Sequence, residues 1–218
     1  MNSETQQKIK TVLGVITVVV LVFLSYGATD YLRSELVVNP VDYDRFDIVI
    51  LGDSITEGLG TSQSFDYVSL LRSHTGLKIR NSGIRNDKTG DALLRIEEDV
   101  LAHDPDVVVI FLGGNDYINF IPKEEIFSNL RRIIQILKDK NIEVLLLGVQ
   151  GGVFYDLYEE DFQLLSIETD VSFIPNILEG VIGNPKLMKD LLHPNDAGHR
   201  AIFDRVAPEL DRIIKKYY

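Results

Sequence analysis

The stretch Asp47-Ile48-Val49-Ile50-Leu51-Gly52-Asp53-Ser54-Ile55-Thr56-Glu57-Gly58 is a short apolar run that stops abruptly at a small, polar turn. A continuous apolar run of this length is typical of a strand buried on both faces of a parallel sheet. Open α/β sheets place their chemistry just beyond the carboxyl ends of the strands, which is where Ser54 falls. Ser54 is therefore a candidate nucleophile, provided that other loops supply a base, a group that orients the base, and donors for an oxyanion.

The chain beyond this stretch alternates between further apolar runs and segments with helical periodicity. This alternation predicts one α/β domain over residues 46–218, with a parallel sheet covered by helices on both faces. In the segment 88–103 we expect a single helix that turns Leu93 and Leu94 inward, and we expect the last helix to bend or restart at Pro208. The further strands are expected at 77–81, 106–112, 142–149 and 171–174, and the helices at 65–73, 88–103, from 122 onward, 155–165 and 195–217.

Residues 11–29 contain no charged side chain and are dominated by Val, Leu and Ile. As a helix they would span about 28 Å, close to the thickness of the hydrocarbon core of a bilayer. Lysines precede the run and acidic residues follow it, so the positive-inside rule places residues 1–10 in the cytoplasm and the rest of the chain outside. We therefore expect a single-pass anchor, a linker over residues 30–45, and an extracytoplasmic domain, periplasmic or at the cell surface.

The alternative for this segment is a signal peptide that is removed. Ser25 and Gly27 are small residues suited to a cleavage site, but the apolar run is longer than the 7 to 15 residues typical of a signal peptide. A retained anchor is therefore favoured over cleavage.

The composition excludes several classes of protein. A formal net charge of −11 argues against a nucleic-acid surface. The absence of cysteine excludes disulfides, a thiolate nucleophile and a lipid-modified cysteine. No cluster shows metal-ligand spacing with histidine, so we expect neither a metal nor a cofactor. The sequence does not indicate an oligomeric state.

Two further loops carry the groups that Ser54 requires. His193 has the carboxylate of Asp190 three residues before it, in a loop that ends at a proline. Asp190 would bind one imidazole nitrogen, so that the other nitrogen removes the proton of Ser54. Asn115 follows a Gly-Gly turn, and its side-chain amide would donate to a developing oxyanion together with the backbone amide of Ser54. Each of these short motifs alone is a common turn, so the prediction depends on their combination.

In combination, the motifs resemble the SGNH hydrolase family, also called GDSL lipases and esterases. The resemblance spans Asp47 to the C-terminus, and the segments 177–181 and 193–199 are similar to the arylesterase, lysophospholipase and acyl-thioesterase branch. It implies a three-layer α/β/α sandwich with a flavodoxin-like, five-stranded parallel sheet. It also implies hydrolysis of an ester or thioester through an acyl-serine intermediate, without a metal. The motifs are Gly52-Asp53-Ser54-Ile55, Gly113-Gly114-Asn115-Asp116 and Asp190-Leu191-Leu192-His193-Pro194.

One motif departs from the family pattern. The family has Asn-x-x-x-Ser-Gly-Asp-Thr, whose glycine amide donates to the oxyanion, whereas this chain has Asn86 at the glycine position. Asparagine tolerates the left-handed backbone region better than most residues, so the amide of Asn86 is our first choice for the donor. Gly83, which matches an earlier small-residue position, is the second choice.

The sequence thus predicts a membrane-tethered serine esterase that acts on lipid-like, aryl or short-chain acyl esters. Two alternatives stay open: a carbohydrate O-deacetylase that acts on cell-envelope polysaccharide, and a non-catalytic, membrane-anchored binding module. Several aromatic residues lie where the helix and strand periodicity of the sequence is weakest. They either line an acyl groove or pack in the core, and packing is slightly favoured. They are Phe154, Tyr155, Tyr158 and Phe162.

Overall fold

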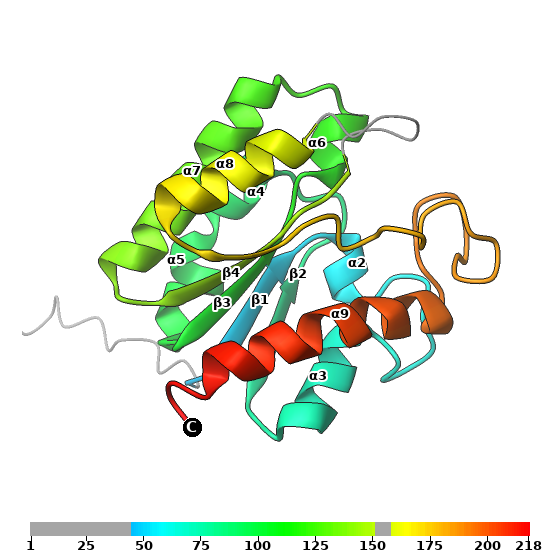
Figure 1. The fold of residues 1–218 in the computed structure, drawn as a ribbon, viewed down its shortest axis with the longest axis horizontal. Coiled ribbons are helices and arrows are strands. Elements are labelled where there is room, and N and C mark those ends of the chain that lie inside the picture. Colours follow the sequence, from blue (N-terminus) through cyan, green and yellow to red (C-terminus); the bar gives the residue numbers. More distant parts are fainter. Residues whose placement is uncertain (1–44, 151–157) are drawn as a thin grey trace, which may run out of the picture. The chain divides into compact units, whose positions relative to one another are not determined.

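Five parallel strands form the centre of the structure, a computed structural model that describes residues 45–150 and 158–218 (Figure 1). The strand order is β2-β1-β3-β4-β5, and neighbouring strands are all parallel. This is the flavodoxin-like order that the family resemblance implies, and it is confirmed. The strands are β1 (Ile48–Gly52), β2 (Ile79–Gly83), β3 (Val107–Phe111), β4 (Glu143–Leu147) and β5 (Ser172–Ile174).

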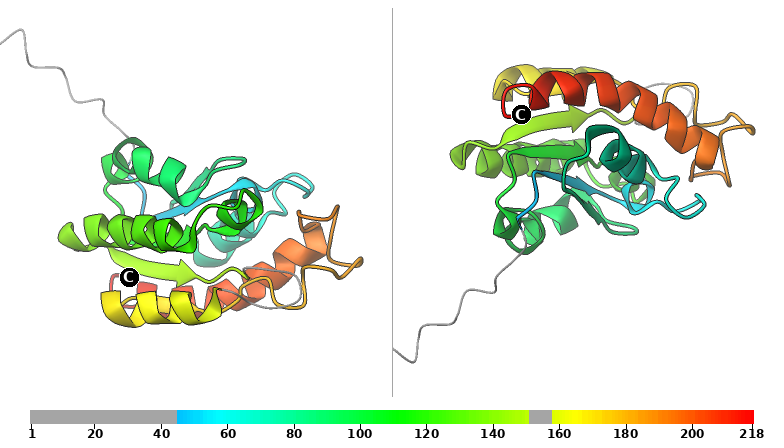
Figure 2. Two further views of the ribbon diagram at one scale, coloured as in Figure 1. Left: turned by 90° about the horizontal axis from the view of Figure 1, so that it is seen from above. Right: turned by 90° about the horizontal axis from the view of Figure 1, so that it is seen from below.

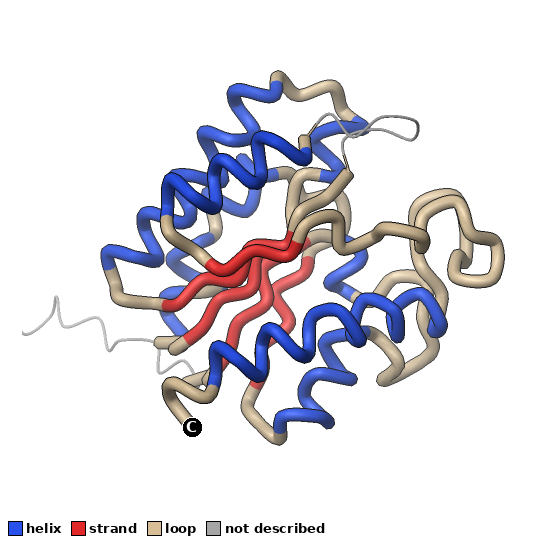
Figure 3. Tube along the Cα trace, viewed as in Figure 1, coloured by secondary structure: helices blue, strands red, loops and turns tan. Residues whose placement is uncertain are grey.

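Helices cover both faces of this sheet, as Figures 1 and 3 show. On one face α3 (Tyr67–Thr75) packs against α9 (Asp196–Ile214). On the other face α7 (Lys123–Asp139) packs against α4 (Thr89–Leu94) and α8 (Glu159–Thr169). Both views of Figure 2 place α8 and α9 along the same edge of the domain.

The core lies between the sheet and these helices. Every residue of β1 and β3 is buried, as their uninterrupted apolar runs predict. The long helix α7 buries one apolar stripe, including Ile126, Leu130 and Leu137, at helical spacing. Each large aliphatic side chain buried in this way contributes roughly 1.5–3 kcal/mol of transfer free energy.

The helices differ from the sequence-based expectation in several places; α8, for example, ends at Thr169 instead of within the expected range of 155–165. The segment expected as one helix over 88–103 consists of α4, α5 (Ile96–Asp99) and the 3₁₀ turn η1 (Leu101–His103). The break falls at Arg95, which ends α4 and whose side chain binds carbonyls of the sheet. Leu94, the last residue of α4, is 88% exposed, so the expectation that it faces inward is wrong. Conversely, α9 continues through Pro208, because its packing along α3 offsets one lost backbone hydrogen bond.

The expected membrane segment at residues 11–29 lies outside the described residues, as do residues 1–10 and most of the linker. Within residues 45–150 and 158–218, no helix is long and apolar enough to span a bilayer. The described domain begins at Arg45, whose guanidinium binds Asp47 and Asp106. These contacts fix the first residue of the domain beside the amino ends of β1 and β3.

Candidate active site

Ser54 lies at the start of the short helix α2 (Ser54–Glu57), two residues after β1 ends. The side chain of Asp53 caps this helix by accepting a hydrogen bond of 3.0 Å from the amide of Ile55. The first amides of a helix have no partner within it, so the backbone N–H of Ser54 is free to donate to a ligand. The sequence thereby places both a hydroxyl and a backbone donor at the carboxyl edge of the sheet.

His193 and Asp190 reach Ser54 from the loop before α9. The Ser54 hydroxyl oxygen is 3.2 Å from Nε2 of His193, and Nδ1 of His193 is 2.9 Å from Oδ2 of Asp190. The amides of Leu192 and His193 also donate to the Asp190 carboxylate, at 2.8 Å each. The hydrogen bond from Leu192 contributes most, with those from His193, to lowering the pKa of Asp190 to about 2. The carboxylate is therefore ionised throughout the neutral range.

Asn115 lies on α6 (Gly114–Ile118), directly after β3 and a left-handed turn at Gly113 with φ of +117°. A side chain at Gly113 would be strained in this conformation. The Asn115 amide nitrogen donates to the carbonyl oxygen of Asp87 at 2.9 Å and lies 3.4 Å from Oδ2 of Asp53. The neighbouring Asp116 is buried and accepts hydrogen bonds from the amide and hydroxyl of Thr89. The loops after β2 and β3 are thus joined at two points.

The two possible backbone donors of the second motif have different surroundings. Asn86 has φ of +66° and lines the cavity in front of Ser54. The amide of Gly83 donates to the side-chain oxygen of Asn81 at 2.9 Å, and a Cβ at Gly83 would lie 2.2 Å from the backbone nitrogen of Glu57. Gly83 therefore allows α2 to pack closely on β2. This geometry favours Asn86 over Gly83 as the oxyanion donor.

The cavity in front of Ser54 has a volume of about 230 Å³. Asn86, Asn115 and His193 give it a polar side, and the rest of its lining is mainly apolar. Tyr158 and Phe162 do not line it; both are buried, and Phe162 stacks on Phe173, so packing is confirmed for these two residues. Phe154 and Tyr155 lie outside the described residues. The apolar lining includes Tyr117, Ile118, Leu178, Ile182, Leu191 and Leu192.

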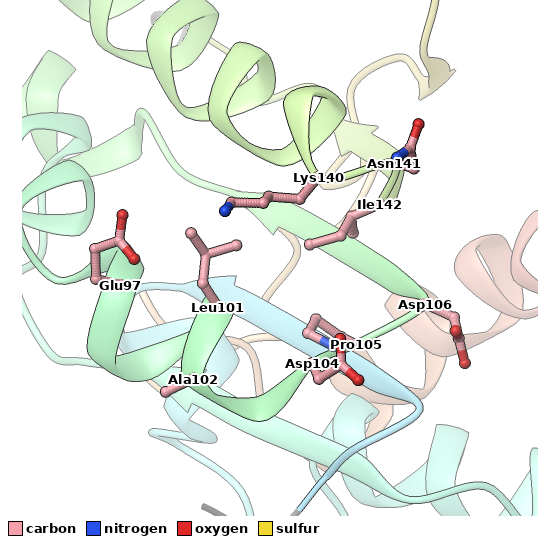
Figure 4. Close-up of a pocket in the computed structure, with 9 residues that line it drawn as sticks. All are labelled: Glu97, Leu101, Ala102, Asp104, Pro105, Asp106, Lys140, Asn141 and Ile142. Atoms are coloured by element: carbon pink, nitrogen blue, oxygen red, sulfur yellow. The ribbon is translucent and has the colours of Figure 1, made fainter. Parts of the chain in front are cut away.

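A larger cavity of about 520 Å³ lies at the opposite edge of the sheet (Figure 4). Its lining includes Glu97, Asp104, Asp106 and Lys140 but no serine or histidine. Ser54, His193 and Asp190 therefore do not line this second cavity. Within the described ranges, no group of three histidine or acidic side chains is placed to hold a metal ion.

Several residues of the site were not singled out by the sequence analysis. Asp87 and Arg95 form an ion pair of 2.7 Å behind Asn86, and Asp53 and Asp116 are buried acids beside Asn115. Burial raises the pKa of Asp53 to about 6. The sequence places these acids within or next to the motifs but does not indicate their side-chain partners, which lie between 8 and 62 residues away along the chain.

A five-stranded parallel sheet with a Ser-His-Asp hydrogen-bond chain at its carboxyl edge defines an α/β serine hydrolase. The model of the GDSL-like lipase/acylhydrolase family matches residues 50–201, more than half of the chain. The chain belongs to this family.

Individual relatives agree with this assignment. The chain is 30% identical over 174 residues to an arylesterase of Vibrio mimicus, covering 75% of this chain and 87% of the relative. It is 29% identical over 175 residues to thioesterase 1/protease 1/lysophospholipase L1 of Escherichia coli strain K12, covering 77% and 84%. The crystal structure of TesA superposes with a TM-score of 0.71 at 27% identity, covering 76% of this chain and 98% of that one.

Proposed function

We propose that this protein is a membrane-tethered, extracytoplasmic esterase that cleaves lipid-like, aryl or short-chain acyl esters through an acyl-serine intermediate at Ser54. The observation that carries the proposal is the continuous hydrogen-bond chain from Ser54 through His193 to Asp190, which opens into a largely apolar cavity. The names of the relatives, an arylesterase and a thioesterase/lysophospholipase, support the same class of substrate.

The geometry leads to the following reaction. His193 Nε2 takes the hydroxyl proton as Ser54 Oγ attacks the ester carbonyl carbon, and the carbonyl π electrons move to oxygen to form an oxyanion. Asp190 holds the imidazole in the required tautomer and stabilises the imidazolium. The amides of Ser54 and Asn86 and the side chain of Asn115 donate to the oxyanion. His193 then protonates the leaving alcohol, and a water molecule activated by the same imidazole releases the acid and restores Ser54.

The acyl group has an apolar place to bind. Tyr117, Ile118, Leu178 and Ile182 are among the apolar residues that line the cavity. At its rim Leu191 is 91% exposed, an unusual position for a leucine in a polar loop. Burying hydrocarbon against these side chains contributes about 25 cal/mol for each Å² removed from water.

The membrane tether is supported by the uncharged run at residues 11–29 and by the lysines that precede it. A lipid-like ester would then be encountered close to the bilayer in which the enzyme is held. Fractionation of cells that produce the full chain, followed by protease treatment of intact cells, tests this placement. Recovery of the intact chain in the soluble cytoplasmic fraction would contradict it.

The catalytic assignment is tested with purified full-length protein and p-nitrophenyl butyrate. Ser54→Ala should lower turnover by about 10⁶-fold, because the three residues act as a unit. Ser73→Ala, which removes an exposed hydroxyl on α3, is the matched control and should leave turnover unchanged. Turnover of the Ser54→Ala variant at the original rate would refute the proposal.

Two further measurements address the alternatives. A fluorophosphonate probe should label Ser54, and absence of labelling would favour a non-catalytic binding module. Rates on acetyl, butyryl and octanoyl esters should show no strict preference for acetyl. A strict preference for acetyl would favour the carbohydrate O-deacetylase.

A further inference from the structure

Arg95 is largely buried behind the active site, where its guanidinium makes four hydrogen bonds. Its Nη2 donates to the carbonyls of Ser82 at 2.9 Å and Gly52 at 3.2 Å. Its Nε donates to the carboxylate of Asp87 at 2.7 Å, and its Nη1 to that of Asp99 at 2.8 Å. One side chain therefore binds the carboxyl end of β1, the end of β2 and the loop that follows β2.

Asp87 connects Arg95 to two of the three oxyanion donors. Its amide closes the turn by donating to the carbonyl of Ile84 at 3.1 Å, and Asn86 is the residue immediately before it. Its carbonyl accepts the hydrogen bond from the side chain of Asn115. A movement of Asp87 would therefore displace the Asn86 amide and the Asn115 amide together.

The turn that carries Asn86 needs such an anchor. Asn86 has a positive φ, a conformation that asparagine tolerates better than most residues but adopts less readily than glycine. Burial raises the pKa of Asp87, and the hydrogen bond and charge of Arg95 oppose this shift, so the ion pair favours the carboxylate form at this position. The planar guanidinium of Arg95 binds both this carboxylate and the carbonyls at the ends of β1 and β2, and so holds the turn to the sheet.

We propose that the Arg95–Asp87 ion pair is a positioning device that holds the backbone amide of Asn86 and the side chain of Asn115 in the oxyanion site. Neither Arg95 nor Asp87 lines the cavity, so neither contacts the substrate. Their effect is exerted through the two donors. A misplacement of about 1 Å at such donors lowers the rate by about 10²-fold without weakening substrate binding. This inference rests on the proposed ester hydrolysis at Ser54.

The test compares removal of the two carboxylates that bind Arg95 in the full-length protein. Asp87→Ala should lower kcat for p-nitrophenyl butyrate by about 10- to 100-fold with KM within about 3-fold. Arg95→Lys, which keeps the charge but cannot form four bonds, should lower kcat in the same direction. Asp99→Ala is the matched control, because Asp99 binds Nη1 of the guanidinium whereas Asp87 binds Nε, and its kcat should change less than about 3-fold.

Inhibition by 1,1,1-trifluoropentan-2-one separates positioning from loss of structure. This ketone forms a hemiketal with an active serine, and its oxyanion needs the same donors as the transition state. Its Ki does not depend on how much of the protein is folded. In Asp87→Ala we expect Ki to rise by the factor by which kcat/KM falls.

Failure of the positioning role and failure of the esterase assignment would give different results. A wild-type kcat and Ki in Asp87→Ala, or equal losses in Asp87→Ala and Asp99→Ala, would overturn the positioning role while leaving the esterase assignment intact. Full turnover by Ser54→Ala would instead overturn the esterase assignment.

Discussion

The side-chain amide of Asn115 donates to the backbone carbonyl of Asp87 at 2.9 Å, across the loops that follow β3 and β2. An amide nitrogen carries two hydrogens, so this bond occupies one of them and fixes the plane of the side chain. The second N–H faces Oδ2 of Asp53, which lies 3.4 Å from the amide nitrogen, a distance at which a hydrogen bond is weak. An oxyanion in the cavity can therefore take the second N–H without breaking the bond to Asp87.

Replacement of Asn115 should reduce the rate more than the binding of substrate. We expect Asn115→Ala to lower kcat by about 10²- to 10³-fold, which is the loss of about 2.7–4 kcal/mol of transition-state stabilisation, with KM little changed. Steady-state kinetics on p-nitrophenyl butyrate measures both constants. Asn141→Gly, a side-chain deletion at the opposite edge of the sheet where φ is positive, is the control and should retain full activity. A KM effect alone in Asn115→Ala would assign this residue to substrate binding.

Asn86 should tolerate glycine but not a β-branched residue. Its φ of +66° is readily adopted by glycine, so Asn86→Gly keeps the backbone donor and should leave kcat within about 3-fold of the original. In Asn86→Val the left-handed conformation costs roughly 1–2 kcal/mol, so the turn should relax and kcat should fall. Kinetics of both variants, with thermal unfolding as the check on folding, tests this expectation. Equal activity of the two variants would mean that the Asn86 amide is not a donor.

The strands and the residues of the Ser-His-Asp chain could be predicted, because each is indicated by a pattern of neighbouring residues in the sequence. An apolar run followed by a small polar turn identifies β1 and Ser54, and the Asp190-to-His193 spacing places a carboxylate beside an imidazole. In a parallel sheet the loops after the strands meet at one edge. His193 therefore lies beside Ser54 although 139 positions of sequence separate them.

The groups behind the site could not be predicted, because their partners are set by the folded chain. Nothing in the periodicity of residues 88–103 indicates that Arg95 leaves the helix to bind the carbonyls of Gly52 and Ser82. Leu94, the last residue before this break, is exposed, although the helical pattern predicts that it faces inward. Likewise, the acid of Asp116 belongs to a recognisable motif, but its bond to Thr89 joins two loops that are distant in sequence.

Asp190 should act by selecting the tautomer of His193. In Asp190→Asn, the amide oxygen can still accept from the backbone N–H groups of Leu192 and His193, but the amide nitrogen would donate to Nδ1. Nε2 would then carry the proton and could not accept that of Ser54, so kcat should fall by about 10³- to 10⁴-fold. Asp196→Asn, which changes a carboxylate that binds Ser62 outside the cavity, is the control in the same assay. A loss of less than about 10-fold in Asp190→Asn would show that another group orients His193.

Asp53 should lower the stability of the native state at neutral pH. Its pKa is raised from 3.8 to about 6, mainly by burial, so the native state binds this proton more tightly than the unfolded state does. The free energy of unfolding therefore falls as pH rises from 3.8 to 6, and the full penalty of roughly 3 kcal/mol applies above pH 6. Asparagine would keep an acceptor for the amide of Ile55 without carrying the charge.

We accordingly expect Asp53→Asn to raise the free energy of unfolding by roughly 1–3 kcal/mol at pH 7.5 and to leave it nearly unchanged at pH 4. Urea unfolding at the two pH values measures this difference, followed by far-UV circular dichroism because the chain has no tryptophan. Asp66→Asn, which changes the less buried acid that caps α3 through Ser69, is the matched control and should show no comparable gain at pH 7.5. A variant less stable than the original at pH 7.5 would mean that the charge of Asp53 supports the fold, and the buried carboxylate beside Ser54 would then be a structural necessity rather than a stability cost of the active site.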